Sequence, residues 1–325
     1  MAPGIIDDEP SGDPDSNHGA PGDSRYDECR IVWAGGNQAR DLAETLSGSA
    51  ATKASGNLAA STIEAGGDLL VLSNRTSLDL CSVAIPDGFN RDTTESVVAA
   101  MGGGPHSTLA AIVADWLAQR LQIPASAVYG YSEPDDLPQA EEVLNKIVSR
   151  LPRLDARTVE ASSPAAMVGW LPEGTLLIVG APGGSWFQRR FFGPGARIQA
   201  KAPSGTIVVN HNPARVYQVM QSPIAYGPNM RVADALQLSN GLDVVVAEDG
   251  KLLGVVKAHT LRDARQDLEL HHVMDHGVFL SADDEFDEAL GLISVDGGDL
   301  IPVVDDQARL VGCISATDLT PPPLS

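Results

Sequence analysis

Residues 214 to 320 contain one sequence pattern twice, and this repeat constrains the fold more than any other feature of the chain. Val219-Met220 recurs as Val273-Met274, and the helical pattern that begins at Val232 recurs from Phe286, in both cases 54 positions later. Each copy reads as a strand, an amphipathic helix, a buried strand, a tight turn, a strand and the start of a helix. The repeat therefore predicts two α+β units of one fold in tandem.

Beyond that helix the offset between the copies becomes 58, because Leu253-Gly-Val-Val256 matches Val311-Gly-Cys-Ile314. We place the four extra residues of the second copy around Asp296-Gly-Gly-Asp299, since a turn absorbs an insertion at little cost. The second copy ends in Gly312-Cys-Ile-Ser315-Ala-Thr-Asp318. This is a strand that runs into a hydroxyl and a carboxylate three residues apart.

The segment resembles a tandem pair of cystathionine-beta-synthase (CBS) domains, whose signature is Gly, two apolar residues, Thr or Ser, two residues and then Asp. The resemblance implies that Asp318 holds the ribose hydroxyls of an adenosine ligand and that Ser315 contacts ribose or phosphate. It also implies that Ile301-Pro302 helps to wall the adenine and that Val278 belongs to the same site. The alternative is that Ser315 and Asp318 only cap a helix, and the two roles can coexist.

The first copy departs from this signature at three positions. Lys257 stands where the hydroxyl belongs, Thr260 stands where the Asp belongs, and Val244 replaces the Pro. We therefore expect one competent site of two. The ligand that the resemblance implies is an adenine nucleotide, either AMP or ATP, with S-adenosylmethionine and a cyclic dinucleotide as further candidates.

From residue 29 to residue 212, short apolar strands alternate with helices, which predicts an α/β fold with a parallel sheet covered on both faces. The strands are expected at residues 30–34, 68–72, 81–85, 96–101, 127–131, 156–159, 175–180 and 205–210. The helices are expected at residues 37–46, 57–65, 107–121, 138–151 and 164–170.

Gly180-Ala-Pro-Gly183 is followed by nine residues and then by Gly193. This spacing, with the strands before it, resembles the nucleotide loop of the universal stress protein family. The resemblance implies a Rossmann-like domain over residues 95–212 whose loop wraps ATP, with Arg189 placed to neutralise phosphate. The alternative is a turn-rich crossover whose arginines face solvent.

Two departures weaken the implied ATP site. Pro194 replaces a hydroxyl residue, and Met101 stands where the family often has an Asp that hydrogen-bonds adenine, so we expect weak ATP binding or none. Gly102-Gly-Gly-Pro-His106 follows a strand and opens a helix, where backbone N–H groups can meet an anion.

Residues 29–94 form a less regular segment. Gly67-Asp-Leu-Leu-Val-Leu72 echoes Gly174-Thr-Leu-Leu-Ile-Val179, which predicts a degenerate α/β half-unit without the glycine loop. We expect it to pack beside the complete unit as two subunits pack in stress-protein dimers. The expected division is thus an acidic disordered tail over residues 1–28, this half-unit, the stress-protein-like domain, and the CBS pair over residues 213–325.

The formal net charge of -21 argues against nucleic acid as a partner. Cys29, Cys81 and Cys313 lack the spacing of metal ligands, and His271-His272 with His276 is read as exposed or interfacial, so no metal is expected. No apolar run is long enough to span a bilayer and the N-terminus lacks a secretory pattern, so we expect a cytoplasmic protein without membrane insertion.

No catalytic constellation stands out, so we favour ligand binding over turnover. The sequence predicts a homodimeric, adenine-nucleotide-binding regulatory protein in which ligand binding to the CBS pair shifts conformation or partner binding. Two alternatives stay open, a soluble regulatory subunit of a membrane transporter or channel, and an ATP-binding stress protein with slow ATPase activity.

Overall fold

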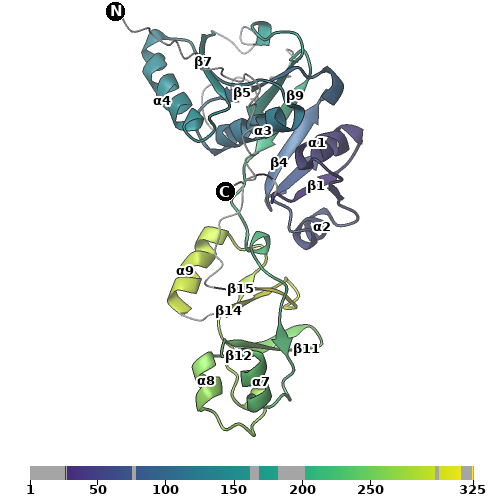
Figure 1. Cartoon of the computed structure of the whole chain (residues 1–325), viewed down its shortest axis with the longest axis vertical. Coiled ribbons are helices and arrows are strands. Elements are labelled where there is room, and N and C mark those ends of the chain that lie inside the picture. The colour runs from purple at the N-terminus through teal and green to yellow at the C-terminus, as the bar shows by residue number, and fades with distance from the viewer. Residues whose placement is uncertain are drawn as a thin grey trace, which may run out of the picture.

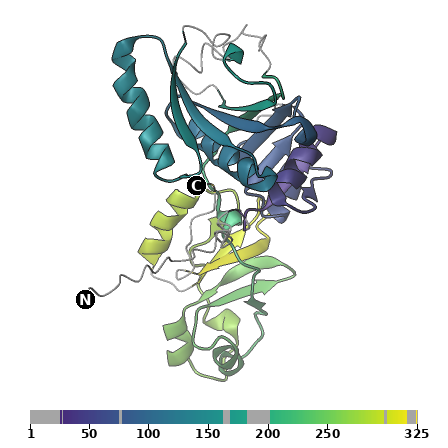
Figure 2. The same cartoon turned by 45° about the horizontal axis from the view of Figure 1, so that its top comes forward.

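The computed structural model places an α/β region at one end of the molecule and the repeated segment at the other (Figure 1). It describes residues 26, 28–74, 78–161, 168–181, 202–296, 300–315 and 324. The second copy of the repeat lies between the α/β region and the first copy, as both views show (Figure 2).

In the described part of the α/β region, nine strands form one sheet, in the order β2-β1-β3-β4-β9-β8-β5-β6-β7. The strands are β1 (Ile31–Ala34), β2 (Thr52–Lys53), β3 (Leu69–Leu72), β4 (Ser82–Asp87), β5 (Ser96–Met101), β6 (Ala125–Tyr131), β7 (Asp155–Glu160), β8 (Thr175–Gly180) and β9 (Thr206–Asn210). The helices are α1 (Asn37–Ser47), α2 (Leu58–Glu64), α3 (Pro105–Leu121) and α4 (Leu137–Val148), with the short 3-10 turns η2 (Arg91–Thr93) and η3 (Pro134–Asp136).

The sheet consists of two parallel halves. In chain order, strands β5 to β9 have the order 3-2-1-4-5 of a doubly wound fold, and β1 to β4 repeat this order with one outer strand missing. The halves meet in an antiparallel pair between β4 and β9, from Val83 opposite Asn210 to Asp87 opposite Thr206. The echo between residues 67–72 and 174–179 falls on β3 and β8, which hold equivalent places in the two halves.

Both faces of the sheet are covered, because the strand residues alternate between two apolar layers. On β5, Val97 and Ala99 pack in the core cluster that contains the buried faces of α1, α3 and α4. Val98 and Ala100 pack on the opposite face. The expected strands are confirmed, and the structure adds the short strand β2. The helix expected from residue 107 begins earlier, at Pro105. Most of the helix expected at 164–170 lies outside the described residues.

Two residues near the ends of the chain contribute to this core. Tyr26, which the sequence placed in the tail, is 3% exposed, stacks on Trp116 at 5.1 Å and donates a 2.6 Å hydrogen bond to Asp115. Arg153 neutralises that carboxylate through two 3.0 Å contacts. Leu324 is also buried in this cluster, so the chain returns to the α/β region after the second copy of the repeat.

Up to and including the last strand of each copy, the two copies of the repeat have the same elements in the same order, and each contains a three-stranded sheet. The first copy contains η4 (Val216–Gln218), β10 (Ala225–Tyr226), α7 (Val232–Leu238), β11 (Val244–Glu248), β12 (Lys251–Val256) and α8 (Ala258–Asp263). The second contains η5 (Leu270–His272), β13 (Leu280–Ser281), α9 (Phe286–Asp296), β14 (Leu300–Val304) and β15 (Leu310–Ser315).

The register of the strands corrects the sequence alignment of the two copies. Val246 pairs with Gly254 and Val303 pairs with Gly312, so β11 and β14 correspond at an offset of 57, one less than β12 and β15. The extra residue lies in the second hairpin, where Ala308 adopts a left-handed conformation. The other extra residues of the second copy lie between the start of α9 and the start of β14, and α9 is about one turn longer than α7. The insertion is therefore not confined to a turn.

Candidate functional site

The predicted ligand residues of the second copy meet at one end of its sheet. Ile301 pairs with Ile314, and Leu300 pairs with Ser315, so the start of β14 lies beside the end of β15. β13 runs parallel to β14 with Leu280 opposite Val303, which brings Val278, two residues before Leu280, toward the same end.

The side chains at this end differ in exposure. Ile301 is 1% exposed, Pro302 is buried, and Val278 and Ser315 are half-buried. Apolar residues thus lie beside a half-buried hydroxyl at this end of the sheet. Asp318 lies outside the described residues, so its place relative to Ser315 remains a prediction.

The first copy fills the equivalent position with its own charges. By the register, Val244 corresponds to Ile301 and Val245 corresponds to Pro302, so the assignment of Val244 to the Pro position was wrong by one residue. Lys257 lies 3.5 Å from Asp243, whose side chain is 4% exposed.

The same Asp243 carboxylate accepts a 2.8 Å hydrogen bond from the backbone N–H of Ala258, the first residue of α8. A carboxylate therefore already occupies the start of this helix, where a phosphate of a ligand would otherwise approach. This geometry agrees with the expectation that the first copy is the less competent of the two.

The signature glycines, Gly254 and Gly312, lie where another segment of the chain approaches the backbone closely. Gln221 of the first copy exchanges hydrogen bonds of 2.9 and 3.0 Å with Cys313, and Asp275 of the second copy exchanges bonds of 2.8 and 2.9 Å with Val255. A Cβ on Gly254 would collide with the carbonyl oxygen of Asp275. One on Gly312 would lie 2.6 Å from the sulfur of Met220. The glycines thus allow each copy to pair with the segment that enters the other.

The second predicted site lies where the strand order of the complete half reverses, between β5 and β8. Gly180 ends β8 against the first turn of α3, and a Cβ there would lie 2.8 Å from the carbonyl carbon of His106. Met101 ends β5, but it is 1% exposed and packs in the core. Gly183, Arg189, Gly193 and Pro194 lie outside the described residues, so the ATP loop stays a prediction.

Two histidines lie beside this reversal point. The backbone N–H of His211 donates to Nδ1 of His106 at 2.9 Å, which makes that nitrogen an acceptor. Burial lowers the pKa of both imidazoles, and the proximity of His106 lowers the pKa of His211 further. Both rings are therefore held toward the neutral form.

At the equivalent reversal point in the N-terminal half, between β1 and β3, Ser73 contacts a glycine pair. The backbone N–H of Gly36 donates to the hydroxyl of Ser73 at 2.6 Å. Gly35 has a φ of +110°, and a Cβ there would collide with the same Ser73 side chain. Ser73 therefore occupies the space beside this glycine pair.

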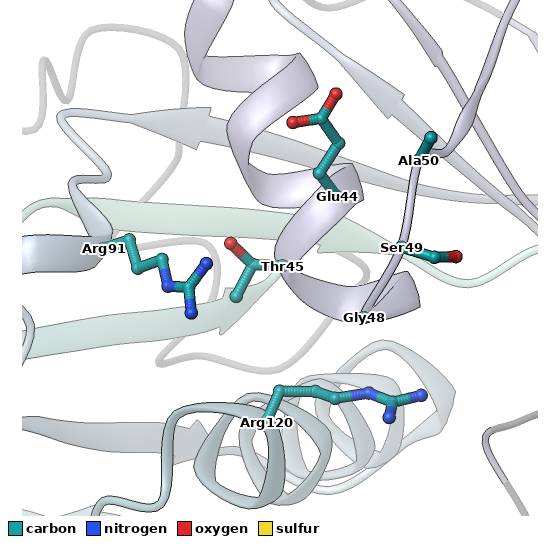
Figure 3. Close-up of a pocket in the computed structure, with 7 residues that line it drawn as sticks. All are labelled: Glu44, Thr45, Gly48, Ser49, Ala50, Arg91 and Arg120. Atoms are coloured by element: carbon teal, nitrogen blue, oxygen red, sulfur yellow. The ribbon is translucent and has the colours of Figure 1, made fainter.

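A cavity of about 570 Å³ lies away from these sites, between the ends of α1 and α3 (Figure 3). Its two arginines are Arg91 and Arg120, and Nε of Arg120 donates to the carbonyl of Leu46 at 3.0 Å. Arg120 therefore caps the C-terminus of α1, where a cation is favoured. In the described part of the chain there is no group of His, Cys, Asp or Glu residues suited to a metal ion.

The comparison with protein families agrees with this repeat. Residues 216–267 and 270–320 match the model of the CBS domain family. This part of the chain is a tandem pair of CBS domains. Among the curated proteins, none matches the chain significantly. No helix in the described segments is both long and apolar enough to cross a membrane.

Similar solved structures each cover about a third of this chain. The cytosolic domain of the Mg²⁺ channel MgtE in complex with ATP is 22% identical, with a TM-score of 0.30, and 32% of this chain and 47% of that chain are covered. CBSX2 in complex with AMP is 19% identical, with a TM-score of 0.29 and coverage of 32% and 91%. The CBS domain pair of protein MJ0100, in complex with 5′-methylthioadenosine and S-adenosylmethionine, is 21% identical, with a TM-score of 0.30 and coverage of 33% and 93%.

Proposed function

We propose that this protein is a regulatory sensor whose second CBS copy binds an adenosine-containing ligand, either AMP, ATP, S-adenosylmethionine or a cyclic dinucleotide. The observation that carries the proposal is the meeting of Val278, Ile301, Pro302 and Ser315 at one end of the second sheet. The chemistry of these residues supports it, because an apolar wall accepts the adenine face and a hydroxyl at its rim accepts a ribose or phosphate contact.

In this proposal Asp318 accepts hydrogen bonds from the two ribose hydroxyls. The first copy does not take part directly, because Lys257 and Asp243 satisfy each other at the equivalent place. Binding at only one of the two CBS sites then favours one arrangement of the pair and shifts its population. We further propose that the protein acts as a cytoplasmic homodimer, which light scattering tests.

The first test identifies the ligand. Mass spectrometry of small molecules that remain with the purified protein is expected to find an adenine nucleotide or S-adenosylmethionine. Calorimetric titration with AMP, ATP and S-adenosylmethionine then measures affinity for the wild-type chain.

The second test locates the site by a matched pair of variants. Asp318→Ala should weaken binding by about 1.5 to 3 kcal/mol, because the ligand loses charged hydrogen bonds. Thr260→Ala alters the equivalent position of the first copy and should leave affinity unchanged. Equal affinity in both variants would remove the site from the second copy.

A further inference from the structure

Among the described residues, the N-terminal half-unit, residues 29–94, packs on the apolar core of the second CBS copy and not on that of the first. The core of the second copy includes Ile301 and Val303 together with Tyr217, which η4 of the first copy contributes, and Ile63 and Leu80 of the half-unit pack against it. The corresponding core of the first copy likewise includes Leu270 from η5 of the second copy. Among the described residues, the two copies therefore differ in what they contact, although their folds correspond.

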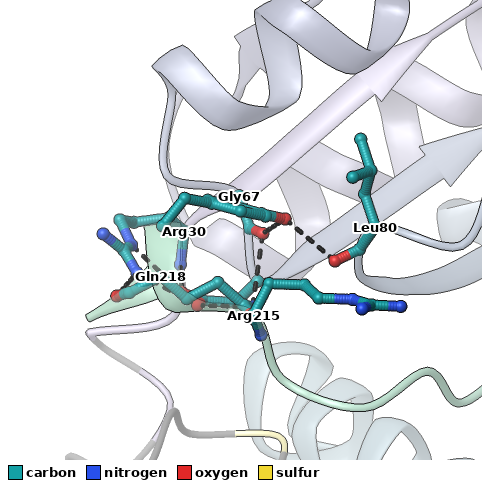
Figure 4. A network of polar contacts seen from close by, with 7 residues as sticks. Arg30, Gly67, Leu80, Arg215 and Gln218 are labelled. Carbon is teal, nitrogen blue, oxygen red and sulfur yellow. Dashed lines mark hydrogen bonds and ion pairs between the residues drawn. The ribbon is translucent and has the colours of Figure 1, made fainter. Parts of the chain in front are cut away.

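Polar contacts fix this shared core to the half-unit (Figure 4). The hydroxyl of Tyr217, which is 1% exposed, lies 2.9 Å from the carbonyl oxygen of Gly67 and 3.3 Å from that of Leu80. Burial raises the pKa of this hydroxyl, so the phenol stays a donor. Arg215 extends the contact, since its guanidinium donates to the carbonyl of Asp79 at 2.9 Å.

The neighbouring Gln218 joins an ion pair of the half-unit in which the carboxylate of Asp68 is buried and the side chain of Arg30 is partly exposed. Its side-chain amide donates to Asp68 at 3.1 Å, and its backbone carbonyl accepts from Arg30 at 2.5 Å. Arg30 also binds the Asp68 carboxylate through contacts of 3.1 and 3.2 Å. Asp68 is 1% exposed, and removing a partner from a buried carboxylate is costly, so Gln218 is held in place.

In the described part of the chain, one of the two equivalent turns of the repeat, η4 of the first copy, takes part in this docking. Tyr217 and Gln218 lie in η4, and His271 and His272 occupy the same positions in η5, 54 residues later. Both histidines are exposed. The same turn is therefore buried against the half-unit in one copy and faces solvent in the other.

We propose that the N-terminal half-unit responds to the state of the second CBS copy, and that Tyr217 and Gln218 carry the response. Ile301, which walls the proposed site, packs in the same cluster as Tyr217. A ligand that orders the ends of β14 and β15 therefore stabilises the surface on which α2 and Leu80 rest. Only the identity of this signal rests on the proposed function; the mechanical coupling is independent of it.

The coupling can be tested without ligand by amide hydrogen exchange on the full chain. Val303 and Val246 are equivalent, and each is fully buried in the core of its own copy. Val303→Ala should speed exchange across residues 58–72 by about tenfold, because the surface beneath them loosens. Val246→Ala should change it by less than about twofold. Equal rates in the two variants would overturn the proposal.

A second set of variants tests the route. Tyr217→Phe keeps the ring and removes the hydroxyl, so exchange at residues 58–72 should rise, and adding Val303→Ala should then have a smaller further effect. His271→Phe, at the matching exposed position, should leave that exchange unchanged. If Val303→Ala does not fold, Ile301→Val makes a smaller cavity in the same cluster and takes its place.

AMP and ATP serve as probes for the ligand step, with binding measured by calorimetry on the samples used for exchange. Binding with slower exchange at residues 58–72 supports the proposal, and binding without any change there contradicts it while the proposed function stands. Failure of both nucleotides to bind counts against the proposed function, and the contrast between Val303→Ala and Val246→Ala still decides the coupling.

Discussion

Lys257 lies 3.5 Å from Asp243, and together they occupy in the first CBS copy the end of the sheet at which the second copy presents Ser315. Two copies of one fold thus differ at the place where we propose that the ligand binds. The first copy supplies a carboxylate to the start of its own helix, and the second has Ile301 and Pro302 beside the hydroxyl of Ser315.

This internal pair should contribute to stability. Asp243→Ala removes the acceptor for the Ala258 N–H and leaves Lys257 without this carboxylate, so we expect a loss of about 2 to 3 kcal/mol in urea unfolding. Asp243→Asn keeps an acceptor and should lose less. Asp267→Ala breaks an exposed ion pair with Arg265 and should have no measurable effect. If the two Asp243 variants match the wild type, the pair has no structural role.

The signature glycines should respond unequally to added methyl groups. Gly254→Ala forces a methyl against the backbone carbonyl of Asp275, and we expect a loss of about 2 kcal/mol or more. Gly312→Ala meets chiefly the flexible end of Met220 and should cost less. Gly291→Ala, in the open part of α9, should stabilise by about 0.5 to 1 kcal/mol. Denaturant midpoints of the three variants test the order, and the reverse order for the first two would refute it.

A carboxylate side chain in place of Met101 should not be tolerated. The resemblance to stress proteins suggested an Asp at this position, but the side chain is 1% exposed in the apolar core beneath α3. Met101→Asp should therefore cost more than about 3 kcal/mol and should not confer ATP binding. Met101→Leu, which nearly keeps the volume, should cost less than about 1.5 kcal/mol. A stable Met101→Asp protein that binds ATP would show that the position faces a ligand.

Acid should destabilise the protein through His211. Burial lowers its pKa from the ordinary value of 6.5, so below that pH the unfolded chain binds more protons than the folded chain. Stability is consequently full above about pH 7 and falls as the pH decreases through about 6.5 toward the lowered pKa. Melting temperatures at about pH 7.5 and about pH 5.5 measure the difference.

Two substitutions separate this effect from general acid unfolding. His211→Gln should narrow the difference between the two melting temperatures, whereas His259→Gln, at an exposed position, should leave it as in the wild type. An acid loss that is identical in all three proteins would exclude His211 as its cause.

Most strands of the α/β region could be predicted because they are short apolar runs. Residues 69 to 72 are buried on both faces, which gives the continuous pattern of a central parallel strand. The repeat likewise revealed the CBS pair, because its spacing survives in Val219-Met220 and Val273-Met274. The pairing of residues between neighbouring strands could not be predicted from the sequence. A single extra residue at Ala308 changes the register of the second hairpin without changing its pattern of apolar residues.

The contact between the CBS pair and the N-terminal half-unit could not be predicted from the sequence. The hydroxyl of Tyr217 donates to the backbone carbonyls of Gly67 and Leu80, which are 150 and 137 positions away, so the side chains of these two partners take no part in the hydrogen bonds. Every residue has a backbone carbonyl, so a carbonyl that accepts such a hydrogen bond cannot be recognised from the sequence. The contrast between Tyr217-Gln218 and His271-His272 was visible in the repeat, but nothing in it said which copy would be buried.

The antiparallel joint between β4 and β9 also bears on how copies of this protein can associate. Each of these strands would be an open edge if its half-sheet stood alone, and here each closes the other. In the described sheet the outer strands are instead β2, with two exposed residues, and β7, which carries Asp155, Arg157 and Glu160. Edge strands that are short or charged resist the addition of a further strand. Another molecule of this protein therefore has no favourable place to continue the sheet, and self-association has to use surfaces made of side chains.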